Sequence, residues 1–561
     1  MFVRLHSQLR CCLVVVLIFL TLQFAVIIFQ QRHRVFNESA AAGLFFHQEQ
    51  LNLCNKFIER TPDRPDSFFQ YNRQLSDKIN AVRELPITRH ESCNTRRYSL
   101  PHYSRAKLSV VISFYNEARS MLLRTILTLI NRTSEDYLHE LIIIDDCSED
   151  VGLLDNLKQL MRNLFTTKSR LTLILKRNQH RKGLIWSRNE GVRVASGNYL
   201  LFLDSHCEVN KGWLEPLLER LALNSSLAVS PLLDPIEPET FSYRTGNVLL
   251  KGGFDWSLHF HWLPRVLAEL ESPEMQYTSP AFAGGILMIS REWFLKLRGF
   301  NPELQIWGGE SIELAIKLWL CGGQIEIVPC SRIGHLFRPR HAFEFPPQFD
   351  QKLDSAQATY LRNSKIIAES WLDEYKYLFY ALKPAAKQIP LNIHEAQLYD
   401  PILIKDGHQC HRFDWYLRHV SPELKLQHWS FSALGTLRNK GRCLHVESTF
   451  PKLELLLTSC FRLKVSQWHL HPETGQLSTE SKRCLGVRNM KSPERPQLML
   501  EPCVTGQVPS QRWQRRDTQL LHAETHLCLD NPLKNQLELS SCRPHAASQS
   551  FQFALEVGAQ A

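Results

Sequence analysis

From residue 107 onward, short apolar runs rich in β-branched residues alternate with segments of helical periodicity. Each run has the length and composition of one buried strand. Four of them, KLSVVISF, LHELIIIDD, RLTLILKR and NYLLFLDSH, begin at residues 107, 138, 170 and 198. This alternation predicts an α/β domain with a parallel sheet covered by helices. Ligands of such sheets bind beyond the carboxyl ends of the strands, so the residues that close the runs are the first candidates for a site.

Two of these runs end in polar side chains. Asp145 and Asp146 close the second run, and Asp204, Ser205 and His206 close the fourth. Residues two apart on a strand share a face, so Asp204 and His206 can be directed at one point. A carboxylate beside an imidazole suits a divalent transition metal and favours Mn²⁺ over Mg²⁺. An isolated D-x-H sequence is more often a capping Asp beside an unrelated His. The metal-site interpretation therefore depends on the surrounding sequence.

The N-terminus contains an apolar stretch, CCLVVVLIFLTLQFAVIIF, that spans residues 11–29. Its length suffices for a helix across a bilayer core of about 30 Å. It ends in QQRHR rather than in the small residues of a cleavage site, which favours an uncleaved signal anchor over a cleaved signal peptide. The flanking arginines do not fix the orientation, because equal numbers precede and follow the stretch.

Cysteines and glycosylation sequons indicate the compartment. The chain has 15 cysteines, several of them spaced like disulfide partners, and sequons at Asn37, Asn131 and Asn224. Together they indicate an oxidising lumen. We therefore expect a cytoplasmic tail (residues 1–10), a transmembrane signal anchor (11–30) and a lumenal remainder. The net charge of +10 is mild and no basic run with interleaved aromatic residues is present, which argues against nucleic-acid binding.

The lumenal part divides by pattern into four segments. We expect a stem and lead-in (31–105), the α/β domain (106–380), a linker (381–426) and an all-β domain (427–561). The last segment repeats a unit of about 40 residues three times, each with two cysteines and then SQW, QRW or QSF. The repeat predicts three lobes around a pseudo-threefold axis, each closed by one disulfide. The expected pairs are Cys443–Cys460, Cys484–Cys503 and Cys528–Cys542.

Three long segments, in this order, resemble the polypeptide N-acetylgalactosaminyltransferases, Golgi enzymes that begin mucin-type O-glycosylation. They are RNEGVRVASGNYLLFLDSHCEVNKGWLEPLLER, GGFDWSLHFHW and FNPELQIWGGESIELAIKLWLCGGQIEIVPCSRIGHLFR, beginning at residues 188, 252 and 300. The resemblance implies a GT-A catalytic domain with a Rossmann-like sheet, followed by a ricin-type β-trefoil lectin domain. It also implies UDP-GalNAc as donor, Ser or Thr of a polypeptide or glycopeptide as acceptor, Mn²⁺ as cofactor, and a single-pass type II protein of the Golgi membrane.

The resemblance also assigns roles to individual residues. The metal ligands are Asp204, His206 and His335. The uridine pocket is assigned to Ser113, Asp146 and Arg181, and the approach to the sugar to Ala283, Gly284 and Gly285. The residues assigned to contacts with the sugar and diphosphate, and to catalysis, are Trp307, Glu310 and Arg338.

The family retains the anomeric configuration of the sugar. A retaining hydrolase uses two carboxylates, one of them as nucleophile, and the sequence offers no convincing pair of this kind. The mechanism implied is a front-face attack in which the leaving phosphate takes the proton of the acceptor. The protein then contributes mainly positioning and charge stabilisation, with Arg338 paired to the diphosphate.

The resemblance implies two further disulfides and two free thiols. The pairs are Cys93–Cys330 and Cys321–Cys410. The expected buried free thiols are Cys147 and Cys207.

The sequence departs from the family pattern at several positions. Ser311 replaces an Asn, Pro339 replaces a basic residue, Ala342-Phe343 replaces Pro-Tyr, and Pro347-Gln348 replaces Gly-Gly. A catalytic lid needs flexible joints, so these changes predict weakened or specialised activity.

The lectin domain departs as well, since only the third repeat keeps the CLD sequence, at Asp530. We treat Asp530 as the candidate sugar-binding residue and as an equally plausible turn residue. The alternative functions are a weak or inactive family member that binds UDP-sugar, glycopeptide or a partner, and a transferase for a different donor sugar.

Overall fold

The computed structural model describes residues 48–556 apart from 103–104, 166–169, 266–271, 273, 346–354, 392–409, 425–432, 450–451, 461–464, 480, 491–494, 507 and 534–535. The predicted cytoplasmic tail and signal anchor, residues 1–30, and the sequon at Asn37 lie outside these residues. Within the described part of the chain, no helix is both long and apolar enough to cross a membrane. The signal anchor therefore stays a prediction from the sequence.

The α/β domain is built on a nine-stranded sheet in the order β3-β2-β1-β4-β10-β6-β11-β5, with β9 paired to β11. The four predicted strands are β1 to β4, and they pair in parallel. The sheet as a whole is mixed, since β10 runs antiparallel to β4 and β6, and β5 antiparallel to β11. The predicted parallel direction holds for β6 and β11, which pair in parallel, and is wrong for β5, β9 and β10, because an apolar run marks a strand but not its direction. The strands are β1 (Leu108–Phe114), β2 (Leu138–Asp145), β3 (Thr172–Arg177), β4 (Tyr199–Asp204), β5 (Cys207–Val209), β6 (Leu227–Ile236), β9 (Tyr277–Thr278), β10 (Leu287–Ser290) and β11 (Gln324–Leu336).

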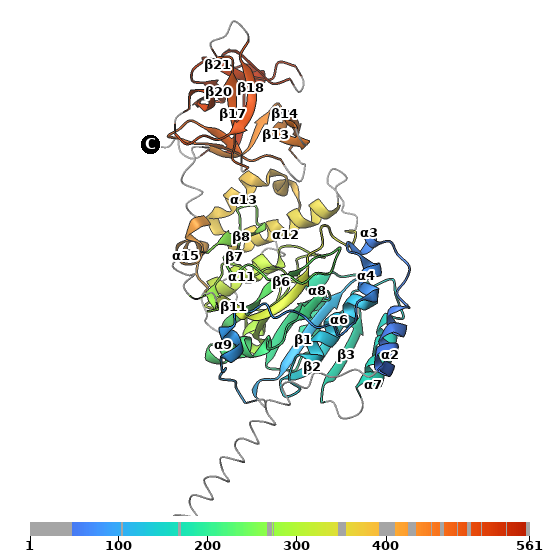
Figure 1. The fold of residues 1–561 in the computed structure, drawn as a ribbon. Helices are drawn as coiled ribbons and strands as arrows, with labels where there is room; N and C mark the ends of the chain where they lie inside the picture. The colour runs from blue at the N-terminus through green and yellow to red at the C-terminus, as the bar shows by residue number, and fades with distance from the viewer. Residues whose placement is uncertain are drawn as a thin grey trace, which may run out of the picture.

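Helices cover both faces of this sheet (Figure 1). Strand β1 is buried along its whole length, and its side chains alternate between two cores. Val110 and Ile112 join the core of α6, α7 and α9, whereas Val111 joins the core of α8 and α11. The carboxyl ends of the strands are thereby held between two packed layers. The helices are α6 (Arg119–Asn131), α7 (Leu153–Leu164), α8 (Leu184–Val194), α9 (Leu214–Leu223), α10 (Arg291–Lys296) and α11 (Glu310–Leu320).

The segment that precedes the sheet is folded onto it. Helix α2 contacts α6 and α7, and its residues Cys54, Phe57 and Ile58 enter the same core as β1. Phe69 and Tyr71 enter a smaller cluster with residues of α6 and β6. These residues belong to the segment predicted as stem and lead-in, so part of that segment packs as catalytic-domain structure. The helices are α2 (Gln48–Ile58), α3 (Asp66–Phe69), α4 (Arg73–Lys78) and α5 (Ser92–Thr95).

Helical elements follow the sheet and lie between it and the C-terminal domain (Figure 1). Helix α13 packs against β12 (Ala433–Asn439) and β23 (Gln552–Glu556) of the C-terminal domain, and Leu434 of β12 belongs to one of the two cores of the α/β domain. The two domains therefore share a continuous apolar contact. The helical elements are α12 (Ser355–Trp371), α13 (Lys376–Leu382) and α15 (Phe413–His419), with the 3₁₀ turns η3 (Asp373–Tyr375) and η4 (Pro384–Gln388). Earlier in the chain, between β6 and β9, β7 (Leu250–Phe254) and β8 (Phe260–Pro264) form a separate hairpin.

The C-terminal domain consists of short antiparallel strands around one core. Trp468, Trp513 and Phe551, the aromatic residues of SQW, QRW and QSF, are all buried in it. The indole Nε1 of Trp468 and that of Trp513 each donate to the carbonyl of the Leu in CLH or CLG, at 2.9 and 2.8 Å. The three repeats therefore place equivalent aromatic residues in one core, and the first two also share the tryptophan hydrogen bond. The elements are β12 (Ala433–Asn439), β13 (Arg442–Thr449), β14 (Lys452–Ser459), β15 (Trp468–Leu470), β16 (Leu477–Thr479), β17 (Arg483–Arg488), β18 (Gln497–Pro502), η6 (Pro509–Gln511), β19 (Trp513–Arg516), β20 (Gln519–His522), β21 (Leu527–Asp530), β22 (Glu538–Ser541), η7 (Ala547–Gln549) and β23 (Gln552–Glu556).

All five expected disulfides are present. One of them, Cys321–Cys410, ties α11 to the segment that precedes α15. Cys207 is a buried free thiol as expected, but Cys147 is partly exposed, because it follows the end of β2 in a turn with φ 67°. The disulfides are Cys93–Cys330, Cys321–Cys410, Cys443–Cys460, Cys484–Cys503 and Cys528–Cys542.

Candidate active site

The predicted metal ligands Asp204, His206 and His335 meet at one edge of the sheet. Asp204 ends β4, His206 precedes β5, and His335 lies on β11, where it pairs in register with Cys207. Each of the three offers a ligand atom, and these atoms lie within 4.8 Å of one another. Asp204 Oδ2 is 3.4 Å from His335 Nε2. The antiparallel register between β5 and β11 therefore brings together ligands that are more than a hundred residues apart in the sequence.

The chemistry of these residues fits Mn²⁺. One carboxylate and two imidazoles form the mixed oxygen and nitrogen set that first-row transition metals accept. Burial and the nearby Arg338 guanidinium lower the pKa of His206, so its imidazole stays neutral, as a metal ligand must be. Burial opposes the ionisation of Asp204, but a hydrogen bond from His335 and the charge of Arg188 outweigh it and hold the pKa of that carboxyl well below its usual range. The site is therefore set to bind a cation over the physiological pH range.

Glu117 is a central site residue that the sequence reasoning missed. It follows β1, and its side chain is only 2% exposed. Its Oε2 accepts from Ser205 Oγ at 2.8 Å, lies 3.1 Å from His206 Nδ1 and accepts from Arg338 Nη2 at 2.5 Å. Burial opposes its ionisation, yet Arg338 and the hydrogen bond to His206 lower its pKa to about 2. A carboxylate on Nδ1 leaves Nε2 of the imidazole for a metal, so Glu117 orients a ligand.

The position of Glu117 could have been found in the sequence. It lies just beyond the end of β1, as Asp146 does beyond β2 and His206 beyond β4. The same argument that singled out acidic ends of the second and fourth runs applies to the first.

Arg188 is a second residue that the sequence reasoning missed. Its side chain, on α8, is 2% exposed, donates from Nη2 to Asp204 Oδ1 at 2.7 Å and lies 3.7 Å from Glu310 Oε1. A Cβ on Gly285 would lie 1.5 Å from Arg188 Nη2 and 2.8 Å from Asp204 Oδ1. The absence of a side chain at Gly285 therefore makes room for the Arg188–Asp204 pair. Gly284 has a φ of 62° and Ala283 is buried beside it.

The residues assigned to the uridine pocket lie at the same edge of the sheet. Ser113 is in register with Asp204, and its Oγ is buried without a protein partner among the described residues. Asp146 Oδ1 accepts from the backbone N–H of Lys182 at 2.8 Å, and Oδ2 from that of Gly183 at 2.7 Å. Asp146 thus holds the turn before α8. A carboxylate can accept about four hydrogen bonds, so a further donor can still be accommodated.

Arg181 connects the uridine side of the site to the loop after β11. Its guanidinium carbon is 4.1 Å from the centre of the Tyr115 ring and 5.1 Å from that of Phe343. Its Nη1 donates to the carbonyl oxygen of Glu344. The described part of the altered loop is therefore held against the site by Arg181. Pro347 and Gln348 lie outside the described residues.

An aromatic cluster continues this contact toward the sugar side. The rings of Trp307 and His341 are 4.4 Å apart, and His341 lies 5.3 Å from Phe343 and 5.5 Å from Phe345. Burial lowers the pKa of His341, which favours the neutral ring in this cluster. The loop after β11 thus packs against Trp307 through the ring of His341, although the loop lacks the Tyr hydroxyl of the family pattern.

Glu310 opens α11 and is buried. Burial raises the pKa of this carboxyl, which Arg188 opposes. Its Oε2 accepts from the backbone N–H of Gly308 at 2.9 Å, and Asn363 of α12 donates to the carbonyl of Gly308 at 2.9 Å. The turn that carries Trp307 is therefore fixed by side chains on both of its flanks. Ser311, which replaces the Asn of the family pattern, lies in the first turn of α11.

The candidate lectin residue Asp530 has its bonds within the protein. It is 1% exposed, and its Oδ2 accepts from Ser540 Oγ, from Arg543 Nη2 at 2.9 Å and from Gln549 Nε2 at 2.9 Å. Its Oδ1 is buried without a partner in the described part of the chain. In the first repeat, His445 takes the place of this Asp and accepts from the backbone N–H of Ser466.

The two described sequons differ in exposure. Asn224 follows α9 on the surface, whereas Asn131 ends α6 with its side-chain oxygen buried, and the Thr133 hydroxyl accepts from Trp213 Nε1 at 3.1 Å. A glycan needs an exposed acceptor, so Asn224 is the better placed of the two.

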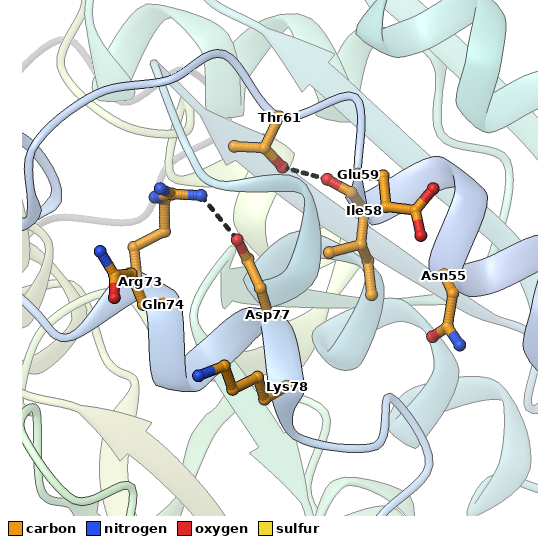
Figure 2. Close-up of a pocket in the computed structure, with 8 residues that line it drawn as sticks. All are labelled: Asn55, Ile58, Glu59, Thr61, Arg73, Gln74, Asp77 and Lys78. Carbon is orange, nitrogen blue, oxygen red and sulfur yellow. Dashed lines mark hydrogen bonds and ion pairs between the residues drawn. The ribbon is translucent and has the colours of Figure 1, made fainter.

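A cavity of about 590 Å³ lies away from the metal ligands, between α2 and α4. Figure 2 shows that Arg73 and Asp77 of α4 point toward each other there, with Arg73 Nη1 2.7 Å from Asp77 Oδ2. No residue assigned to the active site lines it. The lining residues are Asn55, Ile58, Glu59, Thr61, Arg73, Gln74, Asp77 and Lys78.

Three characterised protein families match segments of the chain. Residues 109–298 match the family described as Glycosyl transferase family 2, and residues 264–342 match the N-terminal domain of galactosyltransferase. Residues 417–507 and 466–551 match the ricin-type beta-trefoil lectin domain. These matches cover both the α/β domain and the repeats.

Relatives extend the similarity over most of the chain. The chain is 62% identical over 509 residues to "Putative polypeptide N-acetylgalactosaminyltransferase 13" of Drosophila melanogaster, which covers 90% of this chain and 89% of the relative. It is 37% identical over 485 residues to polypeptide N-acetylgalactosaminyltransferase 14 of Homo sapiens, covering 84% and 82%. The crystal structure of GalNAc-T7 with UDP, GalNAc and Mn²⁺ aligns with a TM-score of 0.68 and 27% identity, over 87% of this chain and 88% of that one. The chain belongs to the polypeptide N-acetylgalactosaminyltransferase family.

Proposed function

We propose that this chain transfers N-acetylgalactosamine from UDP-GalNAc to Ser or Thr of polypeptides, with retention of configuration, and so starts mucin-type O-glycosylation. The observation that carries the proposal is the half-buried cluster of Asp204, His206 and His335 at the edge of the sheet. The related structure of GalNAc-T7 with UDP, GalNAc and Mn²⁺ supports the donor and the ion. The acceptor is a bare or an already glycosylated peptide.

Asp204, His206 and His335 would hold Mn²⁺, which stabilises the negative charge that builds up on the departing UDP. Ser113 and Asp146 bind the uridine, the first with a hydroxyl that has no partner among the described protein groups. Arg181 closes this side through its contacts with the loop after β11.

Arg338 and the turn around Trp307 act on the diphosphate and the sugar. Arg338 is oriented by Glu117, and its Nε is buried without a partner in the described chain, so it can bind an anionic oxygen. Glu310 accepts from the sugar hydroxyls. The acceptor oxygen attacks from the face that UDP leaves, and its proton passes to the phosphate oxygen released by the anomeric carbon. The chain contributes positioning and preorganised charge rather than a nucleophile of its own.

The remaining parts of the proposal concern topology. Residues 1–10 form a cytoplasmic tail and residues 11–30 the signal anchor of a type II Golgi membrane protein, with a stem in the segment 31–105. The catalytic domain is 106–380, with the packed part of the segment 31–105 folded onto it, the linker is 381–426 and the lectin domain is 427–561. Asp530 is the lectin residue for sugar, and Asn37 and Asn224 carry N-glycans, with Asn131 the less exposed candidate.

A second candidate function is a Golgi protein that binds UDP-sugar, glycopeptide or a partner without efficient transfer. The observation that favours it is the loop after β11, where Pro339 and Phe343 replace the family residues and the rings pack on Trp307. A loop held in this way opens less readily for product release.

Radiolabel transfer from UDP-GalNAc to mucin peptides and GalNAc-bearing glycopeptides tests the proposal. The chain is assayed with Mn²⁺, with chelator, and as the Asp204→Ala variant. Transfer that disappears with chelator and in the variant supports the enzyme and its metal site together. A folded chain that binds UDP with Mn²⁺ but transfers to none of the acceptors supports the binding protein instead. Hydrolysis of a panel of UDP-sugars distinguishes a different donor.

A further inference from the structure

Tyr71 comes from the segment ahead of the sheet, yet it contacts the active site. It lies between α3 and α4 and is 1% exposed. Its ring packs 5.9 Å from the ring of Phe69 and 5.8 Å edge-on from that of Phe241. The backbone N–H of the next residue, Asn72, donates to the carbonyl of Pro238 at 3.0 Å. The position of the tyrosine is therefore fixed by apolar packing and by a backbone bond to the loop after β6.

The hydroxyl of Tyr71 is directed at Glu117. It donates to Glu117 Oε1 at 2.8 Å, whereas the opposite oxygen, Oε2, faces Ser205, His206 and Arg338. Burial and the charge of Glu117 raise the pKa of Tyr71 well above its ordinary value, so the hydroxyl keeps its proton and remains a donor. With both oxygens bonded, the carboxylate cannot rotate without breaking a buried hydrogen bond.

The guanidinium of Arg338 contacts both Tyr71 and Glu117. Its guanidinium carbon lies 5.4 Å from the centre of the Tyr71 ring, and its Nη2 donates to Glu117. A cation over the face of an aromatic ring is attracted to it. Tyr71 thus touches one group that orients a metal ligand and one group assigned to the diphosphate.

The segment around Tyr71 contacts the strand end of the site at a second point. Arg83 donates from Nε and Nη2 to the two oxygens of Glu208, each at 2.8 Å. Glu208 lies two residues after His206 on β5, and its side chain is fully buried. Arg124 of α6 lies 3.2 Å from the same carboxylate and also donates to Ser76 of α4. The lead-in is therefore bonded to Glu117, which contacts His206, and to Glu208, two residues after His206.

We propose that Tyr71 is a positioning residue for the metal and diphosphate site, acting through Glu117 on His206 and Arg338. The inference rests on the proposed function only for the identity of the ion and nucleotide. Glu117 contacts His206 through Oε2. Loss of the Tyr71 hydroxyl leaves Oε1 with only the longer hydrogen bond from the backbone N–H of Ala118, at 3.2 Å, so the carboxylate is held less firmly and the imidazole can turn away from the ligand position. Groups that orient a metal-bound His change metal affinity by about 10- to 100-fold. Tyr71 is one bond further from the metal, so we expect an effect of about tenfold, at the lower end of that range.

The test compares Tyr71→Phe with Tyr416→Phe in the full chain. Both substitutions remove one buried hydroxyl and keep the ring. Tyr416 donates to the carbonyl of Pro280 at 3.1 Å, away from the metal ligands, and is the matched control. Mn²⁺ is titrated into each variant in the presence of UDP and followed by calorimetry, and thermal unfolding is measured without Mn²⁺.

We expect Mn²⁺ binding about tenfold weaker in Tyr71→Phe and unchanged in Tyr416→Phe, at similar unfolding temperatures. In the transfer assay, the Mn²⁺ concentration that gives the half-maximal rate should rise in Tyr71→Phe. Equal Mn²⁺ affinity in the two variants overturns the proposal. A fall in the unfolding temperature of Tyr71→Phe with Mn²⁺ affinity unchanged also overturns it, because Tyr71 would then have only a structural role. If the parent chain transfers no sugar while Mn²⁺ binding still responds to Tyr71→Phe, the proposed function fails and the positioning role stands.

Discussion

The pair Arg188–Asp204 and the glycine that makes room for it allow a specific prediction. In Gly285→Ala, the added Cβ would lie 1.5 Å from Arg188 Nη2. Both Arg188 and its surroundings are buried, so the guanidinium must leave Asp204 Oδ1, from which it is now 2.7 Å away. A charged hydrogen bond of this kind contributes about 1.5–3 kcal/mol.

The expected kinetic effect follows from this value. Each 1.36 kcal/mol corresponds to about a tenfold change in rate or affinity. If Arg188 orients Asp204 toward Mn²⁺, Gly285→Ala should lower kcat/KM for UDP-GalNAc by about ten- to a hundredfold and raise the Mn²⁺ concentration for half-maximal rate. Overpacking should in addition lower the free energy of unfolding by about 1–3 kcal/mol.

The assay measures transfer as a function of UDP-GalNAc concentration and of Mn²⁺ concentration, together with thermal unfolding. Gly152→Ala, where a Cβ would meet Asn156 only at 3.3 Å, is the control for a Gly to Ala change at another site. The reasoning is refuted if Gly285→Ala keeps its Mn²⁺ dependence and kcat/KM within about threefold of the parent chain, because the displaced pair would then have no effect on the site.

Three further predictions test other parts of the structure. Phe343→Ala removes the ring that Arg181 contacts, so the loop after β11 should be cut more readily in limited proteolysis than in the parent chain. Phe343→Tyr keeps a ring at this position, so its loop should resist proteolysis as the parent chain does. Glu117 has a folded pKa of about 2, below the ordinary 4.5, so its contribution to stability is present above about pH 4.5 and is lost as the pH falls toward 2. The shift corresponds to roughly 3 kcal/mol, so the stability gap between the parent and Glu117→Gln, measured by chemical denaturation, should narrow between pH 6 and pH 3; a constant gap contradicts the assignment. Asp530→Asn should reduce transfer to GalNAc-bearing glycopeptides and leave transfer to bare peptides unchanged; equal loss on both acceptors means a structural role.

The sequence predicted the metal ligands because they depend on local rules. Asp204 and His206 are two apart at the end of an apolar run, and the resemblance to one family supplied His335. The disulfides and the threefold repeat of the C-terminal domain were predictable for a similar reason, since cysteine spacing and recurring aromatic residues are visible in one dimension.

The groups around the ligands were not predicted because they come from distant segments. Arg188 lies in a helix 16 residues before Asp204, and its partner can be identified only when α8 is packed on the sheet. Tyr71 is 46 residues before Glu117 in a segment whose composition resembles a stem. Strand direction was missed for the same reason, since β10 and β5 reverse according to tertiary connections that hydrophobic patterns do not record.

The contacts of Arg181 change how the residues after β11 that differ from the family pattern are interpreted. By sequence, the loss of glycines and of a Tyr hydroxyl suggested a lid that closes poorly. In the structure, Arg181 lies between the rings of Tyr115 and Phe343 and donates to the carbonyl of Glu344. The resemblance assigns the same Arg181 to the uridine pocket, and on that assignment nucleotide and loop would share one side chain. Since the loop already contacts that side chain, we expect UDP binding to require less ordering of the loop, and any loss of rate to fall on product release rather than on donor binding. Burst kinetics with UDP-GalNAc would separate the two steps, because a slow release gives a rapid first turnover followed by a slower steady state.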